Sequence, residues 1–412
     1  MRELRLDERH PDKQFIKFRR TRGEFTIGKN VFAQLSLAFP TKLVCSGLRE
    51  LEWLSSHHWL PALRHFLSPT LTKIKIFTTP PDDPLQIPLP AIPALPGSYL
   101  QSLELTFYPA DDEPFGNSTS LTILQCGAFL ERLETSAQLS EAAVSHLLGL
   151  RHLRTLRTRS DPPSHLGLPS SDIFPSLETL VLDNRVGRRW LFFLEAAQES
   201  GSTNGDLRTP VAGMKATLTR LFCRGWGGIT VDPAFVSSLC IFQKLTRVFV
   251  DSSCSKKNGC TFLLTDDDVK KLAGALPSVT SLRLGVPCSA NRCHTTALSL
   301  YTLSTHCPGL DYLEIHFNTT ELSHVLDRLF KGPQYTTVRS HPRCPLRYLG
   351  VGDTPISSRD LDSVVIYFPR MFHELQGFRG SYGIGWPEAS RKIQTTYDII
   401  SRILPDTFLI KP

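Results

Sequence analysis

The sequence lacks a strong net charge, a long apolar run and a cysteine framework. Its 46 Lys and Arg against 39 Asp and Glu leave +7 over 412 residues, a charge density far below that of dedicated nucleic-acid or membrane-surface binders. The richest apolar run, 190–194, is closed by Glu195, well short of the ~18 residues of a membrane span. Ten cysteines are too sparse for a disulfide scaffold. Because charges occupy the place of a signal-peptide core, we expect an intracellular protein, cytoplasmic or nuclear, without membrane contact.

The sequence also lacks the short motifs of common enzymes. It contains no GxSxG, no HExxH and no GxxxxGK[ST], and no cysteine stands in a recognisable catalytic signature. Cys288, Cys293 and His306 imitate the opening of a zinc-finger spacing, but no second histidine follows. We therefore expect no enzyme activity, no cofactor and no metal site, with most cysteines serving as small core residues.

A recurring LxxLxL pattern, the seed of a leucine-rich repeat, is the main signal in the sequence. Successive copies start 23 to 41 residues apart, with a median of 29, so the period is loose. The ninth position of such repeats usually holds Asn, and here it does so only at Asn318. The twelve approximate copies start at Leu48, Leu71, Leu100, Leu130, Leu153, Leu177, Leu218, Leu245, Val279, Leu310, Leu346 and Phe372.

Helical patterns between these seeds make the repeating unit a strand followed by a helix. Thr265 with Asp268, and Ser357 with Asp360, are helix-start pairs ahead of apolar residues at i, i+3, i+4 and i+7. Proline marks the return to the next strand, as at 307–310, because it cannot donate the amide that a continuing helix needs. The predicted fold class is α/β: an irregular leucine-rich-repeat solenoid, a right-handed arc of parallel strands with outer helices.

Three regions are expected along the chain. Residues 1–30 form a basic N-terminal segment, poorly ordered or a partial repeat, in which Lys13–Arg22 is either a targeting or polyanion-binding patch or a solvated end. Residues 31–380 form the solenoid, with an insertion at 198–213 that is rich in turn formers. Residues 381–412 form a C-terminal helical cap over the last repeat.

The third and fifth residues of each seed are predicted to point away from the core, onto the concave face of the arc, because strand side chains alternate. Early strands carry mixed charges there, whereas the middle and late strands place arginine beside aromatic residues, the composition that anchors protein interfaces. The alternative is that these are solvated strand residues shielded by loops. The partner-binding candidates are Arg157, Arg220, Phe222, Arg224, Arg247, Phe249, Arg283, Tyr312, Glu314 and Tyr348.

Several segments together resemble the leucine-rich-repeat region of fungal, mushroom-type F-box proteins. They are GLRELEWLSSHHWLPALRHFLSPTLTKIKI at 47–76, LSEAAVSHLLGLRHLRTL at 139–156, FPSLETLVLDN at 174–184, CPGLDYLEI at 307–315 and WPEASRKIQTTYDIISRILPD at 386–406. The resemblance implies the substrate-recognition part of an adaptor of a cullin-RING ubiquitin ligase, in which the F-box binds a Skp-type linker and the repeats hold a protein target. It implies no catalytic residue.

The F-box itself is not visible, since nothing in residues 1–47 matches its LPxE-type helical segment. A Skp-type linker is therefore an expected partner only if an F-box lies upstream of Met1. The alternative function is a free-standing leucine-rich-repeat scaffold or inhibitor protein with no ubiquitin-ligase link. A nucleic-acid-binding version is disfavoured; it would predict binding that falls steeply with salt.

Overall fold

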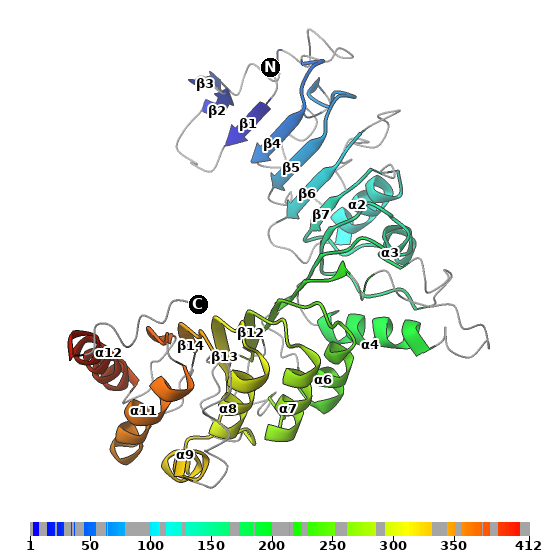
Figure 1. Ribbon diagram of the computed structural model, residues 1–412. Helices are drawn as coiled ribbons and strands as arrows, with labels where there is room; N and C mark the ends of the chain where they lie inside the picture. The colour runs from blue at the N-terminus through cyan, green and yellow to red at the C-terminus, as the bar shows by residue number, and fades with distance from the viewer. Residues whose placement is uncertain are drawn as a thin grey trace. The chain divides into compact units, whose positions relative to one another are not determined.

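The computed structural model consists of two compact units, unit 1 (Met1–Leu218) and unit 2 (Thr219–Pro412), each described here by itself (Figure 1). The residues that the structure describes are 3–7, 15–20, 23–28, 34, 37, 45–54, 63, 65–78, 99–107, 113–125, 129–164, 173–183, 186–199, 214, 217–224, 230–251, 262–285, 293–331, 344–350, 356–372, 374–379 and 386–403.

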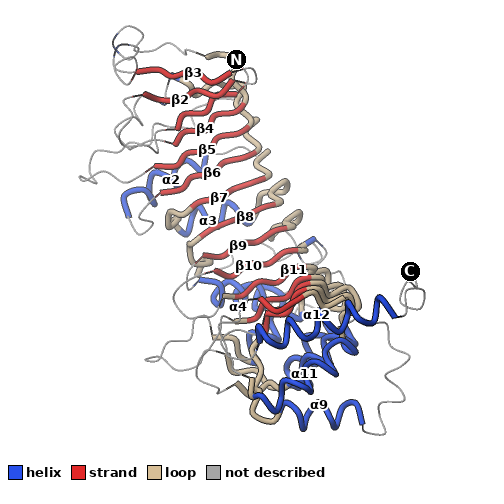
Figure 2. Tube along the Cα trace, turned by 90° about the vertical axis from the view of Figure 1, so that its left-hand side faces the viewer, coloured by secondary structure: helices blue, strands red, loops and turns tan. Residues whose placement is uncertain are grey.

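Unit 1 is a mainly parallel sheet with helices on one side (Figure 2). Strand β1 pairs in parallel with β4, and an antiparallel hairpin of β2 and β3 extends the sheet beyond β1. The strands are β1 (Glu3–Asp7), β2 (Phe15–Arg20), β3 (Gly23–Gly28), β4 (Glu50–Leu54), β5 (Lys73–Thr78), β6 (Ser102–Phe107), β7 (Arg132–Thr135), β8 (Thr155–Thr158) and β9 (Thr179–Asp183). The helices are α2 (Glu113–Gln125), α3 (Glu141–Leu148) and α4 (Val186–Glu199).

Unit 2 repeats the same plan, with parallel strands in chain order and helices along one side of them (Figure 1). Its strands are β10 (Arg220–Arg224), β11 (Arg247–Val250), β12 (Ser281–Leu284), β13 (Tyr312–Ile315), β14 (Tyr348–Gly350) and β15 (Gly377–Arg379). Its helices are α6 (Pro233–Cys240), α7 (Asp266–Ala275), α8 (Ala297–His306), α9 (Leu322–Lys331), α11 (Ser358–Met371) and α12 (Trp386–Ile403).

The predicted fold class is confirmed, because strands and helices alternate into parallel sheets in the manner of a repeat protein. In eleven of the twelve predicted copies the strand begins two residues after the first apolar position, as β13 does after Leu310. The twelfth copy was placed three residues early: Gly377 is in register with Tyr348, so the copy starts at Leu375. Phe372 instead pairs with Cys344 at the turn before the strand. The pattern fits both registers because both positions are apolar.

Leucines of the seeds form the core of each unit. The first-position residues from Leu48 to Leu346 are almost completely buried. Burial alternates along strands such as β6 and β13, as expected of a sheet with one covered face. At the end of unit 2, Trp386 of α12 is fully buried and packs against Phe317, Phe368 and Phe378. Helix α12 thus closes the core beside β15.

Acidic residues in the first turn join neighbouring helices to one another. The predicted Thr265–Asp268 capping box is present, and Ser357 caps α11. Asp266 of α7 accepts hydrogen bonds from the Thr296 amide and hydroxyl, both at 2.8 Å, at the start of α8. Asp360 of α11 likewise accepts from the Ser323 amide of α9 at 3.0 Å. These carboxylates satisfy amides that a helix start leaves without partners.

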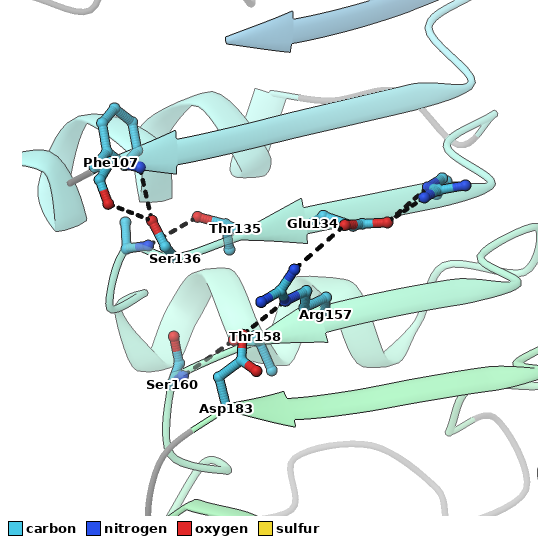
Figure 3. Close-up of polar contacts among 10 residues, drawn as sticks. Phe107, Glu134, Thr135, Ser136, Arg157, Thr158, Ser160 and Asp183 are labelled. Carbon is cyan, nitrogen blue, oxygen red and sulfur yellow. Dashed lines mark hydrogen bonds and ion pairs between the residues drawn. The ribbon is translucent and has the colours of Figure 1, made fainter. Parts of the chain in front are cut away.

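Hydroxyl groups take the place of asparagine in the turns of unit 1 (Figure 3). Thr135 and Thr158 end their strands and each accept a hydrogen bond, at 3.1 Å, from the amide two residues on. Ser136 accepts from the Phe107 amide at 2.8 Å and donates to the Phe107 carbonyl at 3.2 Å. Ser160 accepts from the Leu139 amide at 2.6 Å. Buried or half-buried hydroxyls therefore satisfy the turn amides where asparagine is missing from the sequence.

The predicted regions are described to different extents. The N-terminal segment contributes the backbone of β1 to β3, so Lys13–Arg22 overlaps β2, while its role as a targeting signal stays a prediction. Beyond the end of α4 at Glu199, the predicted insertion at 198–213 lies outside the described residues. Within the predicted C-terminal cap, residues 386–403 form α12.

Candidate binding face

Each sheet has one face covered by helices and one open face, which carries the third and fifth residues of the seeds. All ten candidate residues lie on open faces and are half-buried or exposed. Arg157 belongs to unit 1, and the other nine belong to unit 2. The two open faces differ in how their charges are paired.

On strands β5, β7 and β8, the cations of the open face of unit 1 are paired with carboxylates of the same face. Lys73 pairs with Glu50 at 3.3 Å, and Lys75 pairs with Glu104 at 2.9 Å. Arg132 pairs with Glu134 from the same strand. Charges that already have partners have little to offer a ligand, because a new contact would have to replace an existing one.

Arg157 is held within this paired set (Figure 3). Its guanidinium lies 2.7 Å from Asp183 and 3.9 Å from Glu134, on the two strands that flank β8. Burial by itself lowers the pKa of Arg157, but the hydrogen bond to Asp183 and the surrounding carboxylates outweigh it and the pKa is raised. Arg157 is therefore a structural cross-link of unit 1.

Strand register gathers the nine candidates of unit 2 into adjoining rows. The first row runs across the sheet from Arg220 through Arg247 and Ser281 to Tyr312 and Tyr348. The second row runs from Phe222 through Phe249 and Arg283 to Glu314 and Gly350. Arg224 follows at the end of β10. We call this surface, defined by the nine candidates with Asp251 and Gly350, the arginine–aromatic face.

Three aromatic rings form a continuous stack on the arginine–aromatic face. The Phe222 and Phe249 ring centroids lie 5.2 Å apart with 15° between the ring planes. Phe249 and Tyr312 lie 5.9 Å apart at 27°, across β12, where the first-row residue is the small Ser281. The Arg224 guanidinium lies over the Phe222 ring at 5.3 Å. The stack provides a flat apolar surface with a cation at its edge.

Arg283 is neutralised by two carboxylates. Its Nε lies 3.2 Å from Asp251 and 3.3 Å from Glu314, and the Tyr312 hydroxyl donates to Glu314 at 2.6 Å. Glu314 lies over Gly350, where an added Cβ would come within 2.5 Å of the Glu314 Cγ. Sequence reasoning missed Asp251 and Gly350; Asp251 directly follows its strand seed, but only the register shows which arginine it meets.

The three remaining arginines have no carboxylate partner within 4.0 Å among the residues that the structure describes. Arg220, Arg224 and Arg247 are all exposed. Arg220 and Arg247 are directly opposite each other on β10 and β11, an arrangement of like charges that is unfavourable in a sheet. Within the described part of the chain, no carboxylate therefore holds these arginines, and their guanidinium groups can meet an anionic partner.

Among the described cysteines, Cys223, Cys293, Cys307 and Cys344 are buried, whereas Cys45 and Cys240 are half-buried. The Cys344 thiol lies 3.3 Å from the Leu310 carbonyl, and the Cys307 thiol lies 3.7 Å from the Leu276 carbonyl. Burial raises the pKa of Cys223, Cys307 and Cys344 to about 12, so these thiols are neutral.

The zinc-like spacing is only partly described. Cys293 is buried, the His306 ring lies 2.9 Å from the Thr302 carbonyl, and Cys288 lies outside the described residues. Over the described part of the chain, no three His, Cys, Asp or Glu side chains are grouped so that they could hold a metal ion. Nor does any described helix have the length and apolarity to cross a membrane.

The fold and this face together define a strand–helix repeat protein that carries a charge-unbalanced aromatic surface on unit 2. Comparison with known proteins adds no family: no family model matches the chain, and no curated protein matches it. The function is therefore inferred from the geometry of the arginine–aromatic face and from the resemblance described above.

Proposed function

We propose that the chain is a protein-binding repeat module whose partner docks on the arginine–aromatic face of unit 2. The observation that carries the proposal is the pair of exposed arginines, Arg220 and Arg247, beside a three-ring stack. Arginine and aromatic side chains dominate the energetics of protein interfaces, because they bury large areas and lose little conformational freedom. Among the residues described in unit 1, the self-neutralised face offers no equivalent surface.

The proposal extends to a substrate-recognition role in a cullin-RING ubiquitin ligase, in the cytoplasm or nucleus. Its support is the resemblance of segments 47–76, 139–156 and 307–315 to fungal F-box proteins. In such an adaptor the repeats hold the target and the ligase acts on it by proximity. A free-standing scaffold or inhibitor would use the same face without the ligase.

The test of the binding role is selective capture by matched variants of the full chain. Wild type and Arg220→Glu/Arg247→Glu are immobilised and exposed to a cell lysate, together with the control Lys270→Glu/Lys271→Glu on α7. The control makes the same change of charge at two exposed positions on a helix of the same unit. We expect proteins retained by wild type and by the control to be lost from the arginine variant by about tenfold or more, as for truncated interface hot spots.

Equal retention by all three proteins would overturn the proposal, because the partner would then bind elsewhere. Thermal unfolding of each variant shows whether a loss reflects misfolding. The ligase role is tested separately, by the binding of a purified Skp-type linker to the full chain, with and without the genomic stretch upstream of Met1 translated in frame. If neither form binds the linker while selective capture persists, a free-standing binding module remains.

A further inference from the structure

We infer that the ligand of the arginine–aromatic face is an extended acidic segment of a partner protein, with the alternating pattern acid–x–apolar–x–acid. This inference rests on the proposed function and adds the chemistry of the partner. It follows from three observations. They are the order of side chains along β10, the absence of counter-charges beside Arg220 and Arg247 among the described residues, and the groups that are left there to donate hydrogen bonds.

The order along β10 alternates cation, ring and cation. Arg220, Phe222 and Arg224 are two residues apart, and all three side chains project from the open face. Alternate residues of an extended chain repeat every ~6.6 Å. A partner segment lying along the strand direction therefore presents its residues i, i+2 and i+4 with the same spacing. Carboxylates at i and i+4 meet the arginines when an apolar side chain at i+2 meets the ring stack.

The charge is larger at the Arg220 end of this surface than at the Arg224 end. Arg220 and Arg247 lie side by side in register, and the rest of their row is Ser281, Tyr312 and Tyr348, which carry no charge. At the other end, Arg224 stands in the same row as an acid, since Asp251 donates its amide to the Cys223 carbonyl. The Arg220 end is therefore the stronger anion site, and the acid placed there contributes more to binding.

Among the described residues, the charged donors at the Arg220 end are guanidinium groups, and the backbone amides there are already used, which favours carboxylate over phosphate. The amides beneath the arginines are used inside the sheet: Thr246 and Arg247 both donate to the Thr219 carbonyl, at 2.8 and 3.1 Å. Thr280 and Ser281 donate to the Thr246 carbonyl in the same way. Phosphate sites in proteins commonly add backbone amides from a helix start or a loop. Two planar forks without such amides match the planar carboxylate.

The ring stack supplies the middle of the pattern. Phe222 and Phe249 are half-buried, so part of each ring is open to an incoming side chain. An aromatic or aliphatic residue at i+2 would cover that apolar area, and the flanking ion pairs would lie at its edge, where water is partly excluded.

The experiment measures binding of fluorescein-labelled peptides to the full chain by anisotropy. The probe contains Glu-Ala-Phe-Ala-Glu between glycines; the permuted control contains Glu-Ala-Glu-Ala-Phe, with the same composition and charge. A third peptide replaces both glutamates with glutamine, and a fourth replaces the first glutamate with phosphoserine. Protein variants are Arg220→Gln/Arg247→Gln, Phe249→Ala, and Lys270→Gln/Lys271→Gln as the matched control.

We expect the probe to bind about tenfold tighter than the permuted and glutamine peptides, since one forked charge or one buried ring contributes a factor of that order. The arginine variant and Phe249→Ala should lose this preference, and the lysine control should keep it. Equal binding of the probe and the permuted peptide would overturn the pattern. Much tighter binding of the phosphoserine peptide would overturn the assignment to carboxylate.

The failure of this inference is distinguishable from failure of the proposed function. If no peptide binds, but capture from lysate still depends on Arg220 and Arg247, the face is a protein-binding surface and the acidic-segment inference is wrong. If capture is also independent of these arginines, both are wrong.

Discussion

Arginines of the same face differ according to whether a carboxylate reaches them. Arg283 lies between Asp251 and Glu314 and its side chain is only 29% exposed, whereas Arg220 and Arg247 are exposed and lack such a partner among the described residues. A partly buried charge network contributes to stability chiefly because removal of one member leaves the others uncompensated. The residue type alone therefore does not separate a structural arginine from one that is free to bind.

Replacement of Arg283 should destabilise unit 2, whereas replacement of Arg220 should not. In Arg283→Gln the two carboxylates lose their common cation and repel each other, so we expect a loss of about 1 to 2 kcal/mol in the free energy of unfolding. Arg220→Gln should stay within about 0.5 kcal/mol of wild type, because it relieves a like-charge contact with Arg247. Urea denaturation of the full chain, followed by fluorescence, checks both values.

The contrary result would be equal stability of Arg283→Gln and wild type. Arg283 would then have no structural role and would be grouped with Arg220 and Arg247. A triple reversal of Arg220, Arg247 and Arg283 to Glu, designed from the sequence alone, would be a poor test of binding. It adds a third carboxylate beside Asp251 and Glu314, so lost binding and lost stability would be confounded.

At the scale of elements, the turns of unit 1 depend on buried hydroxyls. Ser160 is fully buried and its hydroxyl accepts from the Leu139 amide at 2.6 Å, from a turn 21 positions earlier in the chain. The Ser160 carbonyl also accepts from the Trp190 indole at 2.7 Å, which fixes α4 against the same turn. Ser160 thus joins the turn at Leu139 through its side chain and α4 through its backbone.

Loss of the Ser160 hydroxyl should cost about 1 to 3 kcal/mol, because Ser160→Ala leaves a buried amide without an acceptor. The bond from Trp190 uses the backbone and should survive. The control is Ser237→Ala on α6, where an exposed hydroxyl donates to the Pro233 carbonyl at 3.0 Å and its removal should be nearly neutral. Urea midpoints of the two variants give the comparison; equal midpoints would mean that another group or water replaces the Ser160 hydroxyl.

The connection between α9 and α11 depends on an ionised carboxylate. Asp360 accepts from the Ser323 amide and, at 2.5 Å, from the Ser323 hydroxyl. Burial by itself raises the pKa of Asp360, but the hydrogen bonds from Ser323 and Ser357 outweigh it, and the pKa lies below its ordinary value. A carboxyl with a lowered pKa stabilises the folded state only while it is ionised.

The contribution of Asp360 should therefore disappear in acid. It is fully present above the unfolded pKa of about 3.9 and is lost as the pH falls through the lower folded-state value. We expect Asp360→Asn to be about 1 to 2 kcal/mol less stable than wild type at pH 7, with the difference shrinking below about pH 4. Urea unfolding at several pH values measures the difference, and Asp362→Asn, at a side chain 79% exposed, is the control. A difference that persists unchanged at low pH would contradict the role of the charge.

At the scale of the whole molecule, the two units share one architecture and differ in the chemistry of their open faces. In unit 1 the cations of β5, β7 and β8 meet acids on their own or neighbouring strands. In unit 2 the cations at the start of β10 and β11, Arg220 and Arg247, lie opposite each other in register. The repeat architecture therefore accounts for stability in both units, and the proposed binding role belongs to one.

The positions of the strands that follow the repeated pattern were predictable from the sequence, with one error, whereas the hairpin of β2 and β3 has no seed and was not predicted. Leucine at the first and fourth positions makes each seed recognisable, because those side chains have to be buried wherever the strand forms. The predicted start of the last copy was wrong because Phe372 and Leu375 are both apolar and lie three residues apart. The pattern therefore fits two registers. Pairing with β14 decides between the registers, and pairing is a property of neighbouring strands.

The sequence by itself determined which side chains lie on the open face, because alternation along a strand is a local property of the backbone. Only the tertiary structure decided which of those charges are neutralised. Arg283 meets Asp251 and Glu314, which lie about thirty residues before and after it, and Arg157 meets Asp183 across 26 positions. These partners come from strands of different repeats and are brought together by the register of those strands in the sheet. Because the repeats differ in length, the sequence does not show which residues will be in register.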